Sequence, residues 1–212
     1  NLIRRQGAAV DDETGDGAAS GEGADSSSGA RMDELRALVR RAGEAIGAGD
    51  WEALDAEIIR LEEFTGSAGR HFRPIITDER NRLFTPSLLA DLVREMSVGG
   101  ETTAAGRMLV RTGEPGISAV IERLGTGPAR VARRACMDWL VANPTATPAL
   151  FHALSQPGTT LLRDVAEVVG RRGSDGAVGL LTPLLSHTNE EVRAAAWRAL
   201  EDIGTSEAIA AL

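Results

Sequence analysis

The side chains that most often do chemistry are few in this sequence of 212 residues. Its three histidines, His71, His152 and His187, lie far apart along the chain. Three scattered imidazoles cannot supply the clustered donors that a metal site requires. His187 falls in a predicted turn, where a solvated or capping side chain is the simpler interpretation. The sequence therefore predicts no metal ligand and no cofactor.

The single cysteine, Cys136, is the other candidate for reactivity. Alone it cannot form an intramolecular disulfide, which fits a reducing compartment. No histidine is near it in the sequence to act as a base, and apolar positions flank it, so a packed thiol is predicted. The glycine-rich stretches 99–100 and 125–127 lack the spacing of a phosphate-binding loop. We expect no catalytic residue, and hence a protein that is not an enzyme.

The charge of the chain disfavours several classes of partner. The net charge is −8, although all 23 basic residues are arginine. An acidic chain repels nucleic acids and anionic membranes at long range. Abundant arginine suits the recognition of phosphates or carboxylates, but together with abundant alanine and glycine it is also what a GC-rich genome produces. No apolar run approaches the roughly 18 residues of a membrane span, so we expect a cytoplasmic protein.

The composition favours helices, because aromatic residues make up only 3% of the chain and small residues are common. Residues 1–30 are rich in Gly, Ala, Ser and Asp, which predicts a disordered acidic linker. Residues 31–65 have the periodicity of a helical hairpin, with Asp50 as the N-cap of its second helix. Residues 66–84 are predicted to form an irregular connector. Thr85 and Pro86 restart a helical pattern, which continues as a repeat array over residues 85–212.

The array repeats with a period of about 31 residues. Its three full units align at the apolar positions Leu124, Leu154 and Leu185; Val131, Leu161 and Val192; Ala135, Val165 and Ala196; and Trp139, Val169 and Leu200. Each unit contains two helices, and one such pair cannot bury its apolar face alone, so the pattern predicts an all-α, solenoid architecture. Trp139 and Trp197 are predicted to lie in or near the core. Thr188 and Glu191 are predicted to form a capping box.

Partial units are predicted on both sides of these three. The second helix of the preceding unit is expected from about residue 101 to residue 112. A further unit begins at Ile209 and Leu212, where the sequence stops. We therefore expect the chain to be an excerpt from a longer protein, with apolar surface exposed around these two residues.

Residues 180–204 read LLTPLLSHTNEEVRAAAWRALEDIG. This stretch resembles the HEAT repeat, especially the short variant of bacterial and phycobilisome lyase-like sequences, and the resemblance covers residues 86–212. Asn189 and Arg193 match two positions that, in the family, help to hold neighbouring units in register. The residues equivalent to Arg193 in the other units are Ala132 and Leu162. Members of the family are mostly scaffolds and adaptors, so the resemblance implies binding of a protein partner.

Other branches of the family would leave marks in the sequence. The hydroxylase type binds iron through His-Glu pairs, and none of the three histidines is followed by glutamate. The DNA glycosylase type needs a strongly basic concave surface, whereas the three second helices (residues 128–142, 159–172 and 189–203) carry a summed charge of only +1. Nothing identifies a bilin pocket of the lyase type. Nucleic acid is therefore an unlikely partner.

The leading hypothesis is a non-catalytic scaffold or regulatory module for protein–protein interaction. The alternative is an accessory repeat module of an enzyme, lyase-like or nucleic-acid-modifying, encoded in a longer chain. In the HEAT arrangement the second helices line the concave face, and mixed charges there suit a protein helix or an acidic peptide. The predicted protein-binding residues are Arg130, Arg133, Arg134, Arg163, Asp164, Glu167 and Arg198.

Overall fold

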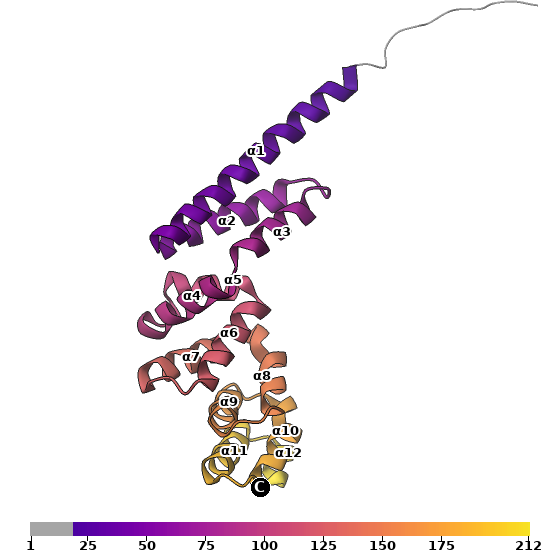
Figure 1. Ribbon diagram of the computed structural model, residues 1–212. Helices are drawn as coiled ribbons and strands as arrows, with labels where there is room; N and C mark the ends of the chain where they lie inside the picture. The colour runs from indigo at the N-terminus through magenta and orange to yellow at the C-terminus, as the bar shows by residue number, and fades with distance from the viewer. Residues whose placement is uncertain (1–18) are drawn as a thin grey trace, which may run out of the picture.

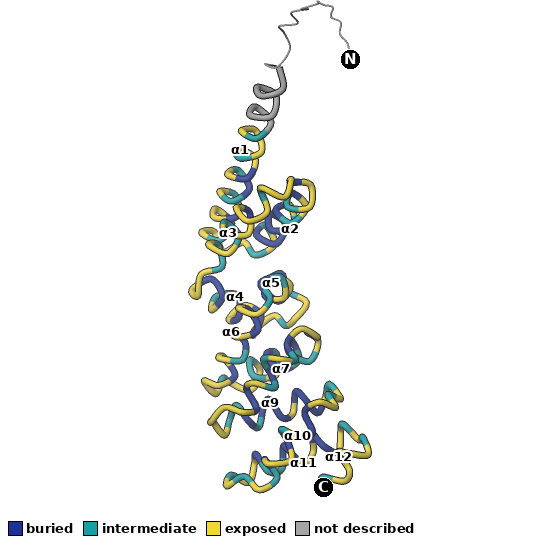
Figure 2. The backbone as a smooth tube through the Cα atoms, turned by 90° about the vertical axis from the view of Figure 1, so that its right-hand side faces the viewer, coloured by how far each residue is buried: buried dark blue, intermediate teal, exposed yellow. Residues whose placement is uncertain are grey.

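The computed structural model describes residues 19–212, and their side chains from residue 28 onward. This part of the chain is an elongated stack of helices without a strand (Figure 1). Buried residues lie on the sides of the helices that face neighbouring helices, and exposed residues follow the outer edges (Figure 2). The architecture is the predicted all-α solenoid.

The N-terminal part is a helical hairpin with a third helix packed on it. Helix α1 (Ala19–Ala48) runs against α2 (Trp51–Ser67), and α3 (Arg73–Leu83) contacts both. Asp50 caps α2 as predicted, because its carboxylate accepts a hydrogen bond of 3.0 Å from the Ala53 amide. Leu35, Leu54 and Ile58 fill the space between the two long helices.

Two segments of this part differ from the sequence-based prediction. Of the predicted linker, residues 1–18 lie outside the described residues, and residues 19–30 form the first turns of α1. Adding a turn to an existing helix costs far less than nucleating one, so a segment that packs against α2 can extend a helix into poor helix formers. The predicted connector 66–84 contains α3, which Pro74 opens and which is anchored by the buried side chain of Ile76.

The repeat array follows as stacked helical pairs. In chain order these are α4 (Pro86–Gly99) with α5 (Ala104–Thr112), α6 (Glu114–Gly125) with α7 (Arg130–Ala142), α8 (Thr147–Leu154) with α9 (Thr159–Arg171), and α10 (Val178–Leu181) with α11 (Glu190–Ile203). The first helices of the last two pairs are short and flanked by 3₁₀ turns, which are η1 (Pro144–Ala146), η2 (Asp175–Ala177) and η3 (Thr182–Ser186). Helix α12 (Ser206–Ala211) comes last. Helices α7, α9 and α11 lie in one column and α6, α8 and α10 in another (Figure 1).

The core confirms one predicted tryptophan and corrects the other. Trp139 is only 2% exposed, and its indole N–H donates a 2.9 Å hydrogen bond to the Gly106 carbonyl. Trp197 is 45% exposed, so its predicted place in or near the core is wrong. The buried stripe of α11 runs through Val192, Ala196 and Leu200 at helical spacing, and Trp197 lies beside that stripe.

Val131 is a second exception among the aligned apolar positions, since it is 72% exposed. The buried stripe of α7 contains Cys136 and Leu140. Extending that stripe backwards at helical spacing passes through residues 132 and 133 rather than 131. In α9, likewise, Leu162 is buried and Leu161 only partly, so α7 and α9 agree with each other. The predicted alignment was therefore out of register by one residue at α11, where Val192, Ala196 and Leu200 are the buried positions.

Candidate protein-binding surface

The exposed sides of α7, α9 and α11 form a continuous face, which we call the second-helix face. One hollow of about 600 Å³ lies over α9 and α11 and is lined by Arg133, Arg163, Glu167 and Arg198, among others. A second hollow of about 660 Å³ lies between the C-terminal end of α4 and α7. Arg171 lines both hollows, so they adjoin.

Six of the seven predicted binding residues lie on this face, and the seventh is buried. Arg130, Arg134, Glu167 and Arg198 are exposed, and Arg133 and Arg163 are half-buried. Asp164 is only 1% exposed, so its prediction as a surface residue is wrong. It belongs to the buried stripe of α9 between Val165 and Leu162, where a carboxylate is tolerated because two guanidinium groups lie over it.

Those guanidinium groups are part of a series of ion pairs between neighbouring second helices. Arg163 donates to Asp164 at 3.0 Å and to Glu191 of α11 at 2.7 Å. Arg133 of α7 lies 4.0 Å from the other carboxylate oxygen of Asp164. Partial burial lowers the pKa of Arg163, but the hydrogen bonds with Asp164 and Glu191 outweigh it and the pKa is raised. The predicted basic patch is therefore largely neutralised by acidic partners.

A second set of ion pairs, centred on Asp138 of α7, lies where the two hollows adjoin. Arg171 of α9 donates to Asp138 of α7 at 2.6 Å, and Arg134 approaches the same carboxylate at 3.6 Å. By contrast, neither Arg130 nor Arg198 forms an ion pair within residues 28–212. These two cations are consequently the ones most available to a partner.

Exposed apolar side chains accompany the free cations. Val98 and Val131 line the hollow between α4 and α7, beside Arg130 and Arg134. Trp197 of α11 is also exposed, but it does not line the hollow that contains Arg198. Tryptophan and arginine are over-represented among the residues that dominate binding energy at protein interfaces. Val131 and Trp197 were predicted as core residues, although their positions off the 3.6-residue stripe indicate exposure.

The ion pairing extends to the N-terminal hairpin, and no pattern in the sequence predicts this. Arg107 of α5 contacts Asp55 at 2.9 Å and Glu52 at 2.7 Å, both in α2. Arg111 contacts Asp55 at 3.0 Å and Glu62 at 2.7 Å. Hydrogen bonding to Asp55 is the main reason that the pKa of Arg107 is raised. Helix α2 thus stacks on α5 much as one second helix stacks on the next.

The turn residues singled out by the HEAT resemblance act differently from expectation. Asn189, not Thr188, is the N-cap of α11, and its side chain accepts from the amides of Glu191 and Val192 at 2.9 and 3.2 Å. Arg193 donates to the carbonyls of His187 and Thr188, so it braces the turn of its own unit.

Arg172, by contrast, contacts the backbone of the neighbouring unit. Its guanidinium donates to the carbonyls of Leu140, Asn143 and Pro144 at 2.8, 2.6 and 3.2 Å. It also donates to the Thr147 hydroxyl at 2.7 Å. Arg172 at the end of α9 therefore holds the turn that joins α7 to α8.

Reactive groups are few in the described structure. Cys136 is fully buried with its sulfur 3.7 Å from the Ser97 hydroxyl, and burial raises the pKa of its thiol. A protonated thiol is a poor nucleophile. Within residues 28–212 no three His, Cys, Asp or Glu side chains are grouped so that they could hold a metal ion. Among the described helices, none is long and apolar enough to cross a bilayer.

These features define an α-solenoid with a preformed, mixed-charge surface. The family model of HEAT repeats matches residues 147–212, which span α8 to α12. This match agrees with the resemblance seen in residues 180–204. No curated protein matches the chain.

Proposed function

We propose that the protein is a non-catalytic binding module of the short bacterial HEAT type, acting in the cytoplasm as a scaffold for a protein partner. The partner lies on the second-helix face. The observation that carries the proposal is the combination, on one preformed face, of Arg130 and Arg198, which form no ion pair within residues 28–212, with the exposed Val131 beside Arg130.

Rigidity of that face supports binding without a large ordering cost. The ion pairs among Arg163, Asp164 and Glu191 fix α9 relative to α11, and Arg171 and Asp138 fix α7 relative to α9. Binding to a surface that is already ordered loses less conformational entropy than binding to a flexible one. The chemistry of the face suits a segment with acidic residues placed beside apolar ones, since the cations with no internal partner would meet carboxylates.

The proposal is tested by capture from nuclease-treated bacterial lysate, followed by purification of the captured protein and measurement of its affinity by calorimetry. The test variant carries Arg130→Glu, Arg134→Glu and Arg198→Glu, because these exposed side chains contribute least to the internal ion pairs. A matched control carries Arg36→Glu, Arg82→Glu and Arg94→Glu, which make the same charge change at exposed sites on α1, α3 and α4.

We expect an identified protein to bind the native chain and the control equally, and to bind the test variant at least about tenfold more weakly. Equal binding to the test variant would remove the second-helix face from the proposal. Capture that disappears on nuclease treatment would favour the alternative of a nucleic-acid-modifying enzyme's accessory module.

A further inference from the structure

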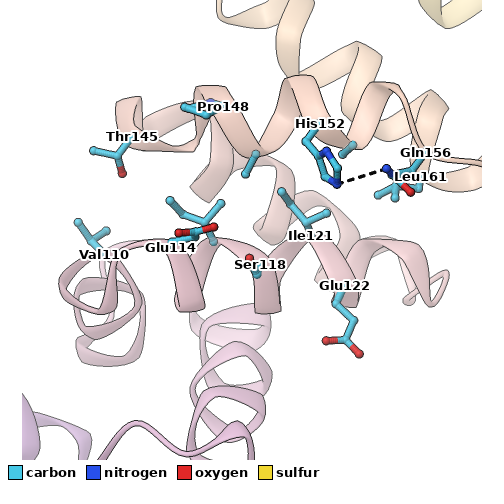
Figure 3. A pocket seen from close by; sticks show the side chains of 14 residues that line it. Val110, Glu114, Ser118, Ile121, Glu122, Thr145, Pro148, His152, Gln156 and Leu161 are labelled. Atoms are coloured by element: carbon cyan, nitrogen blue, oxygen red, sulfur yellow. Dashed lines mark hydrogen bonds between the residues drawn. The ribbon is translucent and has the colours of Figure 1, made fainter. Parts of the chain in front are cut away.

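A groove of about 680 Å³ lies on the other column of helices, between α6 and α8 (Figure 3). Its apolar wall comes from Ile117 and Ile121 of α6, Ala149 of α8 and Leu161 at the start of α9. Val110 of α5 lies at one end, opposite Thr145. The volume is within the range of about 300–1,000 Å³ that is common for ligand pockets.

The groove is open because small side chains face one another across it. Ser118 on α6 and Ala149 and Ala153 on α8 occupy positions where larger residues would close the space. Helix α8 also has only 8 residues, whereas α6 has 12, and a 3₁₀ turn precedes α8. Helices α6 and α8 therefore pack less closely against each other than the second helices of neighbouring units do.

The charge of the groove is opposite to that of the free cations on the second-helix face. Glu114 and Glu122 are exposed lining residues, and neither forms an ion pair within the described side chains. No arginine lines the groove, although every basic residue of the chain is arginine. The Glu114 carboxylate points into the gap between α6 and α8, while that of Glu122 leaves α6 on the far side (Figure 3). The Nε2 atom of His152 is hydrogen-bonded to the Gln156 side-chain amide nitrogen at 3.2 Å.

We propose that this groove binds one amphipathic helix of a protein partner, with its apolar stripe against Ile121 and Leu161 and a lysine or arginine beside Glu114. A helix laid in a groove uses anchors at positions i, i+3 or i+4, and i+7. Glu114 is the carboxylate that faces the gap between α6 and α8, so one basic residue beside the apolar stripe of the bound helix would pair with it. The site is separate from the second-helix face and does not depend on the function proposed for it.

The test uses a synthetic labelled peptide of about 14 residues, with leucines at i, i+4 and i+7 and one lysine beside the leucine stripe. A second peptide carries glutamate in place of the lysine. We expect saturable binding of the lysine peptide by fluorescence anisotropy, and binding of the glutamate peptide at least about tenfold more weakly. Raising the salt concentration should reduce this difference, because the carboxylates are exposed.

Variants then locate the peptide. Glu114→Lys should weaken the lysine peptide about tenfold, and Glu122→Lys should weaken it less, because only Glu114 points into the groove. Ser118→Trp fills the groove from an exposed position and should abolish binding. Glu114→Gln removes the charge without placing a cation at the start of α6, where it would oppose the helix dipole. The matched control is the pair Glu95→Lys and Glu201→Lys, which lies outside the groove and should leave the affinity unchanged.

Three outcomes would overturn the proposal: no saturation of the lysine peptide up to about 1 mM, equal binding of the two peptides, or undiminished binding to a folded Ser118→Trp variant. The last outcome would place the peptide outside the groove. Circular dichroism melts of each variant establish that it is folded, so that a loss of binding reports on the groove.

Discussion

The interface between α9 and α11 and the space between α6 and α8 show two ways in which neighbouring repeats meet. In the first, a Cβ atom at Gly170 would lie 2.6 Å from the Cα of Ala199, so the two helices touch backbone to backbone. Ion pairs then close the edge of this interface. In the second, α6 and α8 also present small residues to each other, but the helices do not approach closely, and an open groove remains between them.

The difference shows that small side chains do not by themselves determine how tightly two helices pack. At α9 and α11 both helices have a full length of 13 and 14 residues, and a long stripe of contacts holds them together. At α8 the helix is too short to follow α6 over its whole length. In a repeat protein, where stability is mainly a sum of nearest-neighbour interfaces, the first contact therefore contributes rigidity, and the second leaves surface for a ligand.

Gly170→Leu should break the tight interface and have the largest effect on stability. The new side chain would overlap the backbone of α11, and overpacking against backbone cannot be relieved by a rotamer change. We expect a loss of about 3 kcal/mol or more, with amide exchange protection lost first in α10–α12. Thermal unfolding and hydrogen exchange measure both.

Gly179→Ala is the matched control, because a Cβ there meets no atom within 4 Å. It should be neutral or slightly stabilising, since alanine is a better helix former than glycine. A Gly170→Leu variant as stable as this control would show that α9 and α11 do not approach as closely as described.

Arg172→Ala tests how strongly the end of α9 is held to the turn between α7 and α8, because the Arg172 guanidinium bridges these two segments. The substitution leaves the Leu140 and Asn143 carbonyls without this donor, and we expect a loss of about 2 kcal/mol. Arg171→Ala is the control. It removes one partly exposed ion pair with Asp138, and it should cost less than about 1 kcal/mol. Equal losses in the two variants, measured by denaturant unfolding, would argue against a clamp at Arg172.

The sequence predicted the fold well where apolar periodicity is strong. The helical hairpin, the repeat array and the caps at Asp50 and Thr85 follow from local patterns that a single sequence displays. Helix α3 was missed because it buries few side chains, and its signals, Pro74 at the start and arginines in the last turn, were weaker than the polar character of the segment.

The candidate surface was predicted less completely, because pairing between helices is not visible in a sequence. Arg133 and Arg163 were correctly placed on second helices, but their acidic partner Asp164 was taken for a surface residue. Only three-dimensional packing shows that it lies under them. The groove between α6 and α8 depends on the length of α8 and on what lies opposite Ser118, so no local motif marks it.

Thiol reactivity provides a further comparison of the closed and open regions. Cys136 of α7 is buried against α4, whereas a cysteine placed by Ser118→Cys would lie exposed in the groove. At pH 8 an aromatic disulfide reagent should label the Ser118→Cys thiol rapidly. It should label Cys136 only as fast as the structure opens, because burial excludes the reagent and raises the thiol pKa. Rapid labelling of both thiols would show that the second-helix column is not closed.

The raised pKa of Cys136 also gives stability a definite dependence on pH. The folded state holds its proton above the pKa of about 8.5 that a free thiol has in the unfolded chain. The contribution of the protonated thiol to the free energy of unfolding is therefore fully present below that value. It is lost as the pH rises toward the folded pKa, by at most about 1.4 kcal/mol per pH unit. Unfolding by urea between pH 8 and pH 10 should show a smaller decline for Cys136→Ala than for the native chain, after subtraction of its constant cavity cost. Parallel declines would mean that the thiol ionises as easily in the folded protein as in the unfolded chain, and that Cys136 is in contact with water.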